Sequence, residues 1–118
     1  MPIDPVALVR RYHAALNRYT AAEVAAMFAA DAIYQSPGVG ALRGREAIIA
    51  AFTAYFAEHP DQHALDEKIT REGDMAAASQ WRLTATSRST GEPYHRQGAE
   101  TVSFNGDGLI VRVDVEDQ

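Results

Sequence analysis

The chain has 118 residues, 47% of them hydrophobic, and a formal net charge of −5, which fits one domain over residues 1–118 with a packed core. Nucleic acid and anionic membrane surfaces are disfavoured as partners, because both attract basic patches and none is apparent in this sequence. The absence of cysteine excludes disulfides and a thiolate nucleophile, and a cytoplasmic location is expected because the N-terminus carries no signal-peptide pattern.

The N-terminal region is predicted to form two helices. Asp4 is a suitable N-cap for a helix that begins at Pro5, where the missing N–H costs nothing. Apolar residues then recur at steps of three and four, which marks one buried face of this helix. Thr20 followed by Glu23 is a capping-box pattern, and it predicts a short second helix that extends to Phe28.

A strand, a loop and a third helix are predicted next. Residues 32–36 have the composition of a short strand, and residues 37–40, which contain one proline and two glycines, predict a loop. The third helix is expected to open at residues 44–46. It is expected to end at His59, because Pro60 disfavours helical backbone in the residue before it.

The second half of the chain is predicted to consist of four strands separated by turns. The turn that contains Asn105 and Gly106 is a strong hairpin signal. Short connections between successive strands favour antiparallel pairing. An α+β fold is therefore expected, with three N-terminal helices on the concave face of a bent antiparallel sheet. The expected strands are residues 62–72, 75–88, 94–104 and 109–116.

One carboxylate is predicted to lie on the inner face of this sheet. In the strand 94–104, Val102 and Phe104 are expected to face the core, and alternation places Glu100 on the same side. A carboxylate buried among apolar groups either has a raised pKa or has a partner. Two alternatives stay open: Glu100 reaches water near the end of the sheet, or it pairs with an arginine such as Arg96.

Tyr12 is the second candidate for chemistry, because it lies on the apolar face of the first helix. Its ring belongs in the core, and its hydroxyl needs a hydrogen-bond partner. The alternative is an ordinary core tyrosine with no part in a site.

The four histidines do not indicate a metal site. His59 and His63 are four positions apart, but Pro60 prevents one helix from carrying both on the same face. His13 and His95 have no neighbour at a ligand spacing. Neither a metal nor a cofactor is therefore expected. No serine stands in a nucleophile-elbow sequence, so a serine hydrolase is not expected.

The segments at residues 11–17, 27–32, 42–48, 59–61 and 104–106 follow one another in an order and spacing that cover nearly the whole chain. Together they resemble the nuclear transport factor two-like superfamily. Residues 11–17, 27–32 and 104–106 are similar to segments of bacterial ketosteroid isomerases. Residues 42–48 and 59–61 are more similar to the SnoaL-like polyketide cyclase branch. The resemblance implies a cone-shaped sheet around one apolar pocket, a small hydrophobic molecule as its ligand, and a homodimer.

The resemblance to the isomerases also implies roles for individual residues. Tyr12 falls on the family's oxyanion-hole tyrosine, and Glu100 falls on its oxyanion-hole aspartic acid with one methylene more. Ser36 stands where the family has its general-base aspartate, and a serine hydroxyl does not serve as a proton acceptor at neutral pH. Steroid isomerisation by the family's mechanism is therefore not expected unless Ser36 is replaced by aspartate.

Two functions are consistent with these residues. The first is an isomerase- or cyclase-type enzyme that acts on an apolar carbonyl compound, with Tyr12 and Glu100 at the oxygen. A protonated Glu100 would join Tyr12 in donating hydrogen bonds to an enolate, whereas an ionised Glu100 would be the base, and both versions stay open. The second is a non-catalytic ligand-binding or dimerisation domain of the same fold. The expected pocket wall comprises Ser36, Trp81, Phe52, Phe56 and Val102.

The homodimer is expected to form through the outer face of the sheet. In the strand 75–88, Trp81, Leu83 and Ala85 are expected to face inward. The alternate side chains are polar, so they can meet a second copy without leaving a large apolar patch exposed on the single chain. This outer row comprises Gln80, Arg82, Thr84 and Thr86.

Overall fold

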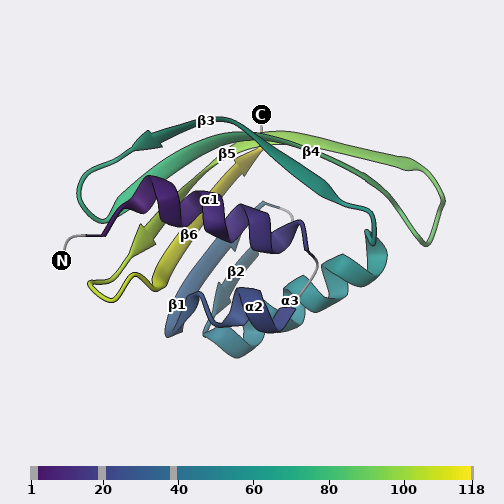
Figure 1. The fold of residues 1–118 in the computed structure, drawn as a ribbon. Coiled ribbons are helices and arrows are strands. Elements are labelled where there is room, and N and C mark those ends of the chain that lie inside the picture. Colours follow the sequence, from purple (N-terminus) through teal and green to yellow (C-terminus); the bar gives the residue numbers. More distant parts are fainter. Residues whose placement is uncertain (1–2, 19–20, 38–39, 118) are drawn as a thin grey trace.

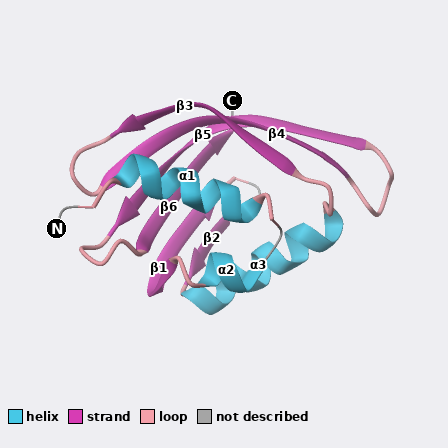
Figure 2. Ribbon diagram, viewed as in Figure 1, coloured by secondary structure: helices cyan, strands magenta, loops and turns pink. Residues whose placement is uncertain are grey.

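A computed structural model describes residues 3–18, 21–37 and 40–117 of the chain. These residues form three helices and six strands that belong to one sheet, in the spatial order β2-β1-β6-β5-β4-β3. The sheet is strongly curved but does not close, and the helices lie on its concave side (Figures 1 and 2). The elements are α1 (Pro5–Leu16), α2 (Ala21–Ala25), β1 (Phe28–Ser36), β2 (Gly40–Arg43), α3 (Arg45–Glu58), β3 (His63–Arg71), β4 (Ala76–Thr86), β5 (Pro93–Phe104) and β6 (Ile110–Asp117).

The predicted α+β fold, with three helices on the concave face of a bent sheet, is confirmed. The prediction of purely antiparallel pairing is wrong at one place, because β1 and β6 run parallel, with Tyr34 opposite Val113. The other four strand pairings are antiparallel. The parallel pair joins a strand near the start of the chain to its last strand. Local turn signals report only pairings between successive strands, so they could not reveal it.

Two further boundaries differ from the sequence prediction. Phe28 begins β1 instead of ending the second helix, because it pairs with Ile110 of β6 and becomes fully buried there. Strand β2 occupies residues predicted as the end of a loop and the approach to a helix, and it pairs with the last residues of β1. Both differences come from long-range or cross-strand pairing that overrides local preference. The capping-box threonine, Thr20, and residues 38–39 of the predicted loop lie outside the described residues.

Helix α1 begins as predicted. Asp4 is its N-cap, and the Asp4 carboxylate accepts a hydrogen bond of 3.2 Å from the backbone N–H of Ala7. Pro5 occupies the first helical position, where its lack of an N–H leaves no bond unmade. The buried face of α1 includes Val9 and Tyr12, which pack into the main core with residues of the sheet.

Strand β4 shows the predicted alternation between its two faces. Trp81, Leu83 and Ala85 are buried on the concave side. The side chains between them, which form the outer row defined above, are exposed. The inner face of the sheet is therefore available to form a pocket with the helices.

None of the helices in the described part of the chain has the length and apolar character that a membrane span needs.

Candidate functional site

A pocket of about 110 Å³ lies between α1, α3 and the concave face of the sheet. Its wall is mainly aromatic and aliphatic, which suits an apolar ligand. Six of the seven site residues predicted from the sequence line it: Tyr12, Ser36, Phe52, Phe56, Trp81 and Glu100. The seventh, Val102, lies on the same face of β5 as Glu100 but is fully buried in the main core and does not reach the pocket.

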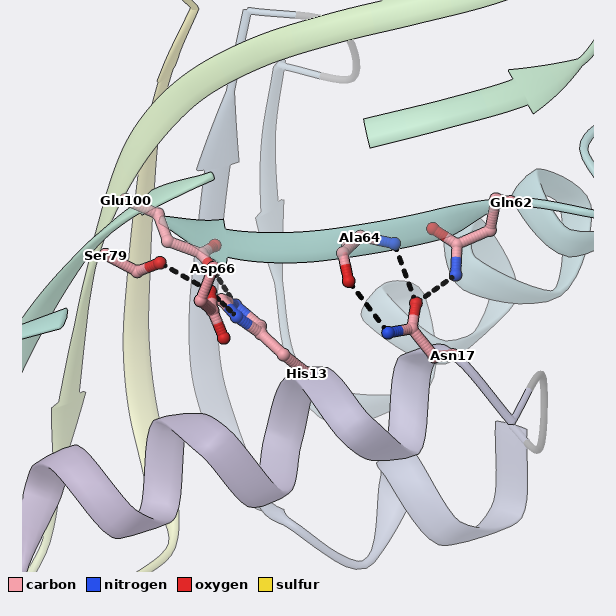
Figure 3. A network of polar contacts seen from close by, with 7 residues as sticks. All are labelled: His13, Asn17, Gln62, Ala64, Asp66, Ser79 and Glu100. Carbon is pink, nitrogen blue, oxygen red and sulfur yellow. Dashed lines mark hydrogen bonds and ion pairs between the residues drawn. The ribbon is translucent and has the colours of Figure 1, made fainter. Parts of the chain in front are cut away.

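Glu100 is buried on the pocket wall, as its place in the alternation of β5 predicts. Its side chain is 7% exposed. It is therefore largely withdrawn from water. Arg96 places its guanidinium carbon 5.4 Å from the centre of the Trp81 ring. The carboxylate of Glu100 contacts Nε2 of His13, which projects from α1 (Figure 3).

His13 is held by carboxylates at both of its ring nitrogens. Its Nδ1 lies 2.6 Å from Oδ1 of Asp66 on β3, and its Nε2 contacts Oε1 of Glu100 on β5. An ionised carboxylate only accepts hydrogen bonds, so the ring satisfies both neighbours by donating from both nitrogens as an imidazolium. We refer to His13, Asp66 and Glu100 as the charged triad (Figure 3).

The electrostatics of the charged triad favour a positive His13. Burial by itself lowers the pKa of His13, but the charge of Glu100 and the hydrogen bonds to both carboxylates outweigh it and raise that pKa to about 10. For Asp66, burial raises the pKa, and the hydrogen bond and charge of His13 together with a hydrogen bond from Ser79 outweigh it, so the net pKa is lowered. The triad therefore holds a positive His13 between the side chains of Asp66 and Glu100 at neutral pH.

Tyr12 lies on the pocket wall next to the charged triad. Its side chain is buried, and its ring meets that of Phe28 edge-to-face at a centroid distance of 5.6 Å. Burial, then the influence of Tyr34 and the charge of Glu100, raise the pKa of Tyr12 well above its usual value. Its hydroxyl therefore keeps its proton at any physiological pH and remains a hydrogen-bond donor.

Two members of the triad, His13 and Asp66, are not among the site residues predicted from the sequence. The sequence prediction treats His13 only as a possible metal ligand, although it stands four positions after the buried Val9 and so lies on the same helix face. This spacing could have identified His13 as a residue on the buried face of the helix. Asp66 carries no such signal, because a register shift between Asp66 and Lys68 changes which side chains of β3 face inward. Within the described part of the chain, no group of three or more His, Cys, Asp or Glu residues is arranged to hold a metal ion.

Comparison with protein families matches a SnoaL-like domain model to residues 9–113, which is most of the chain. The chain belongs to the SnoaL-like family. This agrees with the resemblance found in the sequence and with the curved sheet that encloses the pocket. No curated protein matches this SnoaL-like chain.

Solved structures share the fold at low sequence identity. An NTF2-like protein of unknown function from Exiguobacterium sp. 255-15 is 16% identical, with a TM-score of 0.83, over 94% of this chain and 98% of that one. The epoxide hydrolase/cyclase-like enzyme SalBIII, described for its role in pyran ring formation in the polyether salinomycin, is 14% identical with a TM-score of 0.83, over 94% and 88% of the two chains. A hypothetical protein of ketosteroid isomerase-like fold from Catenulispora acidiphila DSM 44928, in complex with trimethylamine, is 21% identical with a TM-score of 0.82, over 92% and 83%.

Proposed function

We propose that this SnoaL-like chain is an enzyme of the isomerase or cyclase type that acts on a small apolar carbonyl compound. Glu100 takes a proton from the carbon next to the carbonyl, and Tyr12 donates a hydrogen bond to the carbonyl oxygen as it becomes an enolate. The observation that carries the proposal is the buried Glu100 carboxylate, placed on the wall of an apolar pocket and held against His13.

Of the two versions that the sequence left open, the contact with His13 favours Glu100 as the base. An imidazolium that donates to Glu100 stabilises the carboxylate, because a hydrogen bond and an opposite charge both favour the ionised form. Only one of the two carboxylate oxygens contacts His13. The other oxygen is the one that we assign as the proton acceptor. The proton is then returned to a different atom of the substrate, which completes an isomerisation with no net change in protons.

Tyr12 supplies the complementary part of this mechanism. Its hydroxyl keeps its proton, and it lies on the same pocket wall as Glu100. A preorganised donor in a water-poor pocket stabilises a developing oxyanion more than it stabilises the neutral carbonyl, which is what lowers a barrier. The mechanism needs no aspartate at Ser36, because Glu100 takes the role that the isomerase family gives to that position.

The proposal can be tested without knowledge of the natural substrate. A panel of small cyclic ketones is incubated with the protein in D₂O, and proton NMR follows the replacement of protons next to the carbonyl by deuterium. We expect the wild type to accelerate this exchange for at least one ketone. Glu100→Gln is expected to lower the rate by about 10²- to 10⁴-fold, the usual contribution of a general base, and Tyr12→Phe to lower it without abolishing it.

Glu116→Gln is the matched control, because Glu116 lies on the neighbouring strand β6 and is exposed. It removes the same charge by the same chemical change and is expected to leave the exchange rate unaltered. Exchange by the wild type that persists undiminished in Glu100→Gln would overturn the assignment of the base. No acceleration for any ketone that binds would count against the proposed reaction.

A second function is supported by a specific observation in the triad. Both ring nitrogens of His13 and one oxygen of Glu100 are already committed to partners within the protein, as they would be in a polar cluster that only supports a binding pocket. This reading corresponds to the non-catalytic ligand-binding domain. It predicts ketone binding, seen as saturation transfer from protein to ligand protons, with no accelerated exchange.

A further inference from the structure

Asp66 is the member of the charged triad that does not line the pocket. Its carboxylate contacts the ring nitrogen of His13 that does not face Glu100. The Asp66 side chain is 17% exposed, whereas those of His13 and Glu100 are each 7% exposed. Oδ1 of Asp66 accepts hydrogen bonds from two sides, from Nδ1 of His13 at 2.6 Å and from Oγ of Ser79 at 2.7 Å (Figure 3). A ligand in the pocket therefore meets Glu100 but not Asp66.

The inward position of Asp66 comes from an irregularity in β3. Asp66 is opposite Trp81 and Lys68 is opposite Gln80, so Glu67 is an extra residue with no partner of its own on β4. Such a β-bulge reverses the alternation of the strand, and bulges are frequent beside functional sites because they redirect a side chain. Without the bulge, the inward face set by Ile69 would continue through Glu67 and Leu65, and Asp66 would point outward.

This arrangement leaves an apolar side chain exposed on the surface. Leu65 is 59% exposed, the most exposed large hydrophobic residue in the described part of the chain. With the bulge, Ala64 lies opposite Leu83 where Leu65 would otherwise lie, and Asp66 lies opposite Trp81 where Glu67 would otherwise lie. The bulge therefore exposes a leucine and places the shorter of two neighbouring carboxylates on the inner face, where it contacts His13.

We infer that Asp66 is a positioning residue that keeps the proton on His13 and thereby keeps Glu100 ionised. This inference rests on the proposed role of Glu100 as the base. Two carboxylates on one imidazole require both ring nitrogens to carry protons. If Asp66 becomes neutral, an imidazolium has only Glu100 to balance it, and the proton between Nε2 and Glu100 is free to move to the glutamate. Glu100 is then a carboxylic acid and cannot accept a proton from the substrate.

The charged groups around His13 are consistent with this role. From the sheet, Asp66 on β3 and Glu100 on β5 face the ring, and Ser79 on β4 supports Asp66. From its own helix, Tyr12 contributes a neutral ring at a centroid distance of 5.3 Å, and Arg10 acts on Asp66 by its charge. Asp66 is the group that supplies the second negative charge to His13.

The test uses Asp66→Asn, which keeps the size of the side chain and removes its charge. Nitrogen-15 NMR of the His13 ring at pH 7 reports whether each nitrogen carries a proton, with no need for a substrate. We expect both nitrogens to be protonated in the wild type and one of them to lose its proton in Asp66→Asn. Exchange of the responding ketone is expected to slow by at least about 10-fold at pH 7, as the fraction of ionised Glu100 falls, while ketone affinity changes little.

Glu67→Gln is the matched control, since Glu67 is the adjacent residue, carries the same charge and is exposed beside Arg82. It is expected to leave the His13 signals unchanged. Ser79→Ala is a milder variant for the case in which Asp66→Asn does not fold. It removes the donor that competes with His13 for Oδ1 of Asp66, which leaves the carboxylate a stronger acceptor, and is expected to raise the pH at which His13 loses its second proton.

The outcomes separate this inference from the proposed function. If His13 keeps both protons at pH 7 in folded Asp66→Asn, or if Ser79→Ala leaves the titration of His13 unchanged when Asp66→Asn is unfolded, the role given to Asp66 is overturned. A different outcome is that the His13 ring responds as expected while the wild-type protein accelerates deuterium exchange in none of the ketones. In that case the proposed reaction fails, while the control of the His13 proton by Asp66 stands.

Discussion

At the scale of single residues, the charged triad brings three ionisable side chains together on the inner side of the sheet. Burying three ionisable groups costs hydration, and buried ion pairs often do no better for stability than an apolar replacement. His13 and Glu100 are both on the wall of the pocket, where an apolar side chain would have completed the lining. A functional use of the charges explains their presence better than stability does.

The raised pKa of His13 predicts how stability depends on pH. In the unfolded chain a histidine titrates near 6.5, while in the folded protein the pKa of His13 is about 10. Its contribution is therefore fully present below about pH 6.5 and is lost progressively as the pH rises to about 10. The lowered pKa of Asp66 acts in the opposite direction, because its contribution is lost as the pH falls through the acidic range.

We expect the difference in unfolding free energy between wild type and His13→Gln to shrink between pH 7 and pH 9, by up to about 1.4 kcal/mol per pH unit. Urea denaturation of both proteins at pH 5, 7 and 9 measures it. His63→Gln, at an exposed position of β3, is the control and is expected to show a constant difference. A difference for His13→Gln that stays constant from pH 7 to pH 9 would contradict a raised pKa.

At the scale of elements, one asparagine joins the end of α1 to the start of β3. Asn17 is the C-cap of α1, and its side chain makes two hydrogen bonds to the backbone of Ala64, one as donor at 2.9 Å and one as acceptor at 2.8 Å (Figure 3). Gln62 donates to the Asn17 side chain at 3.2 Å and to the backbone of Leu16 at 3.0 Å. These bonds dock the helix that carries His13 against the strand that carries Asp66.

Asn17→Ala is expected to destabilise the protein by about 1–3 kcal/mol, because it leaves both backbone groups of the half-buried Ala64 without their side-chain partner. Asn17→Asp keeps the acceptor for the Ala64 N–H and loses the donor to its carbonyl, so a smaller loss is expected. Urea denaturation midpoints at pH 7 measure both. Equal stability of Asn17→Ala and wild type would show that the docking of α1 does not depend on this residue.

Most helices and strands could be predicted from local patterns in the sequence. The apolar spacing and the Asp4 cap predicted α1, and alternation predicted both faces of β4. The sequence did not reveal β2 or the parallel pairing of β1 with β6. Strand pairing depends on which segments meet in the folded chain, and local propensity carries little information about that.

At the scale of the whole molecule, we propose that the chain forms a homodimer through the outer face of the sheet. The outer row is exposed along one side of β4. A symmetric dimer places the same patch of each copy against the other, and threonine and arginine side chains on such a patch can make hydrogen bonds across it. The opposite, concave face holds the pocket, so dimerisation would leave the site accessible.

Thr84→Asp is expected to convert the dimer to a monomer, because symmetry brings the added charge of one copy close to that of the other. Light scattering at micromolar concentration measures the mass. Thr53→Asp, at an exposed position of α3, adds the same charge on another surface and is expected to remain dimeric. Finding only monomer for the wild type at this concentration would refute the dimer.

The sequence by itself determined the local features of the site. Alternation along β5 placed Glu100 on the inner face, and helical spacing placed Tyr12 on the apolar face of α1; both residues line the pocket. These placements depend on periods of two residues in a strand and 3.6 in a helix, which neighbouring side chains reveal.

Only the tertiary structure decided which partner Glu100 has. His13 is 87 positions from Glu100 and 53 from Asp66, and their contacts depend on how α1 docks on the sheet and on the bulge at Glu67. A bulge shifts the alternation of a strand by one residue, and the pairing with β4 decides where it occurs. The physical reason is that periodicity specifies the face on which a side chain lies, whereas long-range packing decides what it meets there.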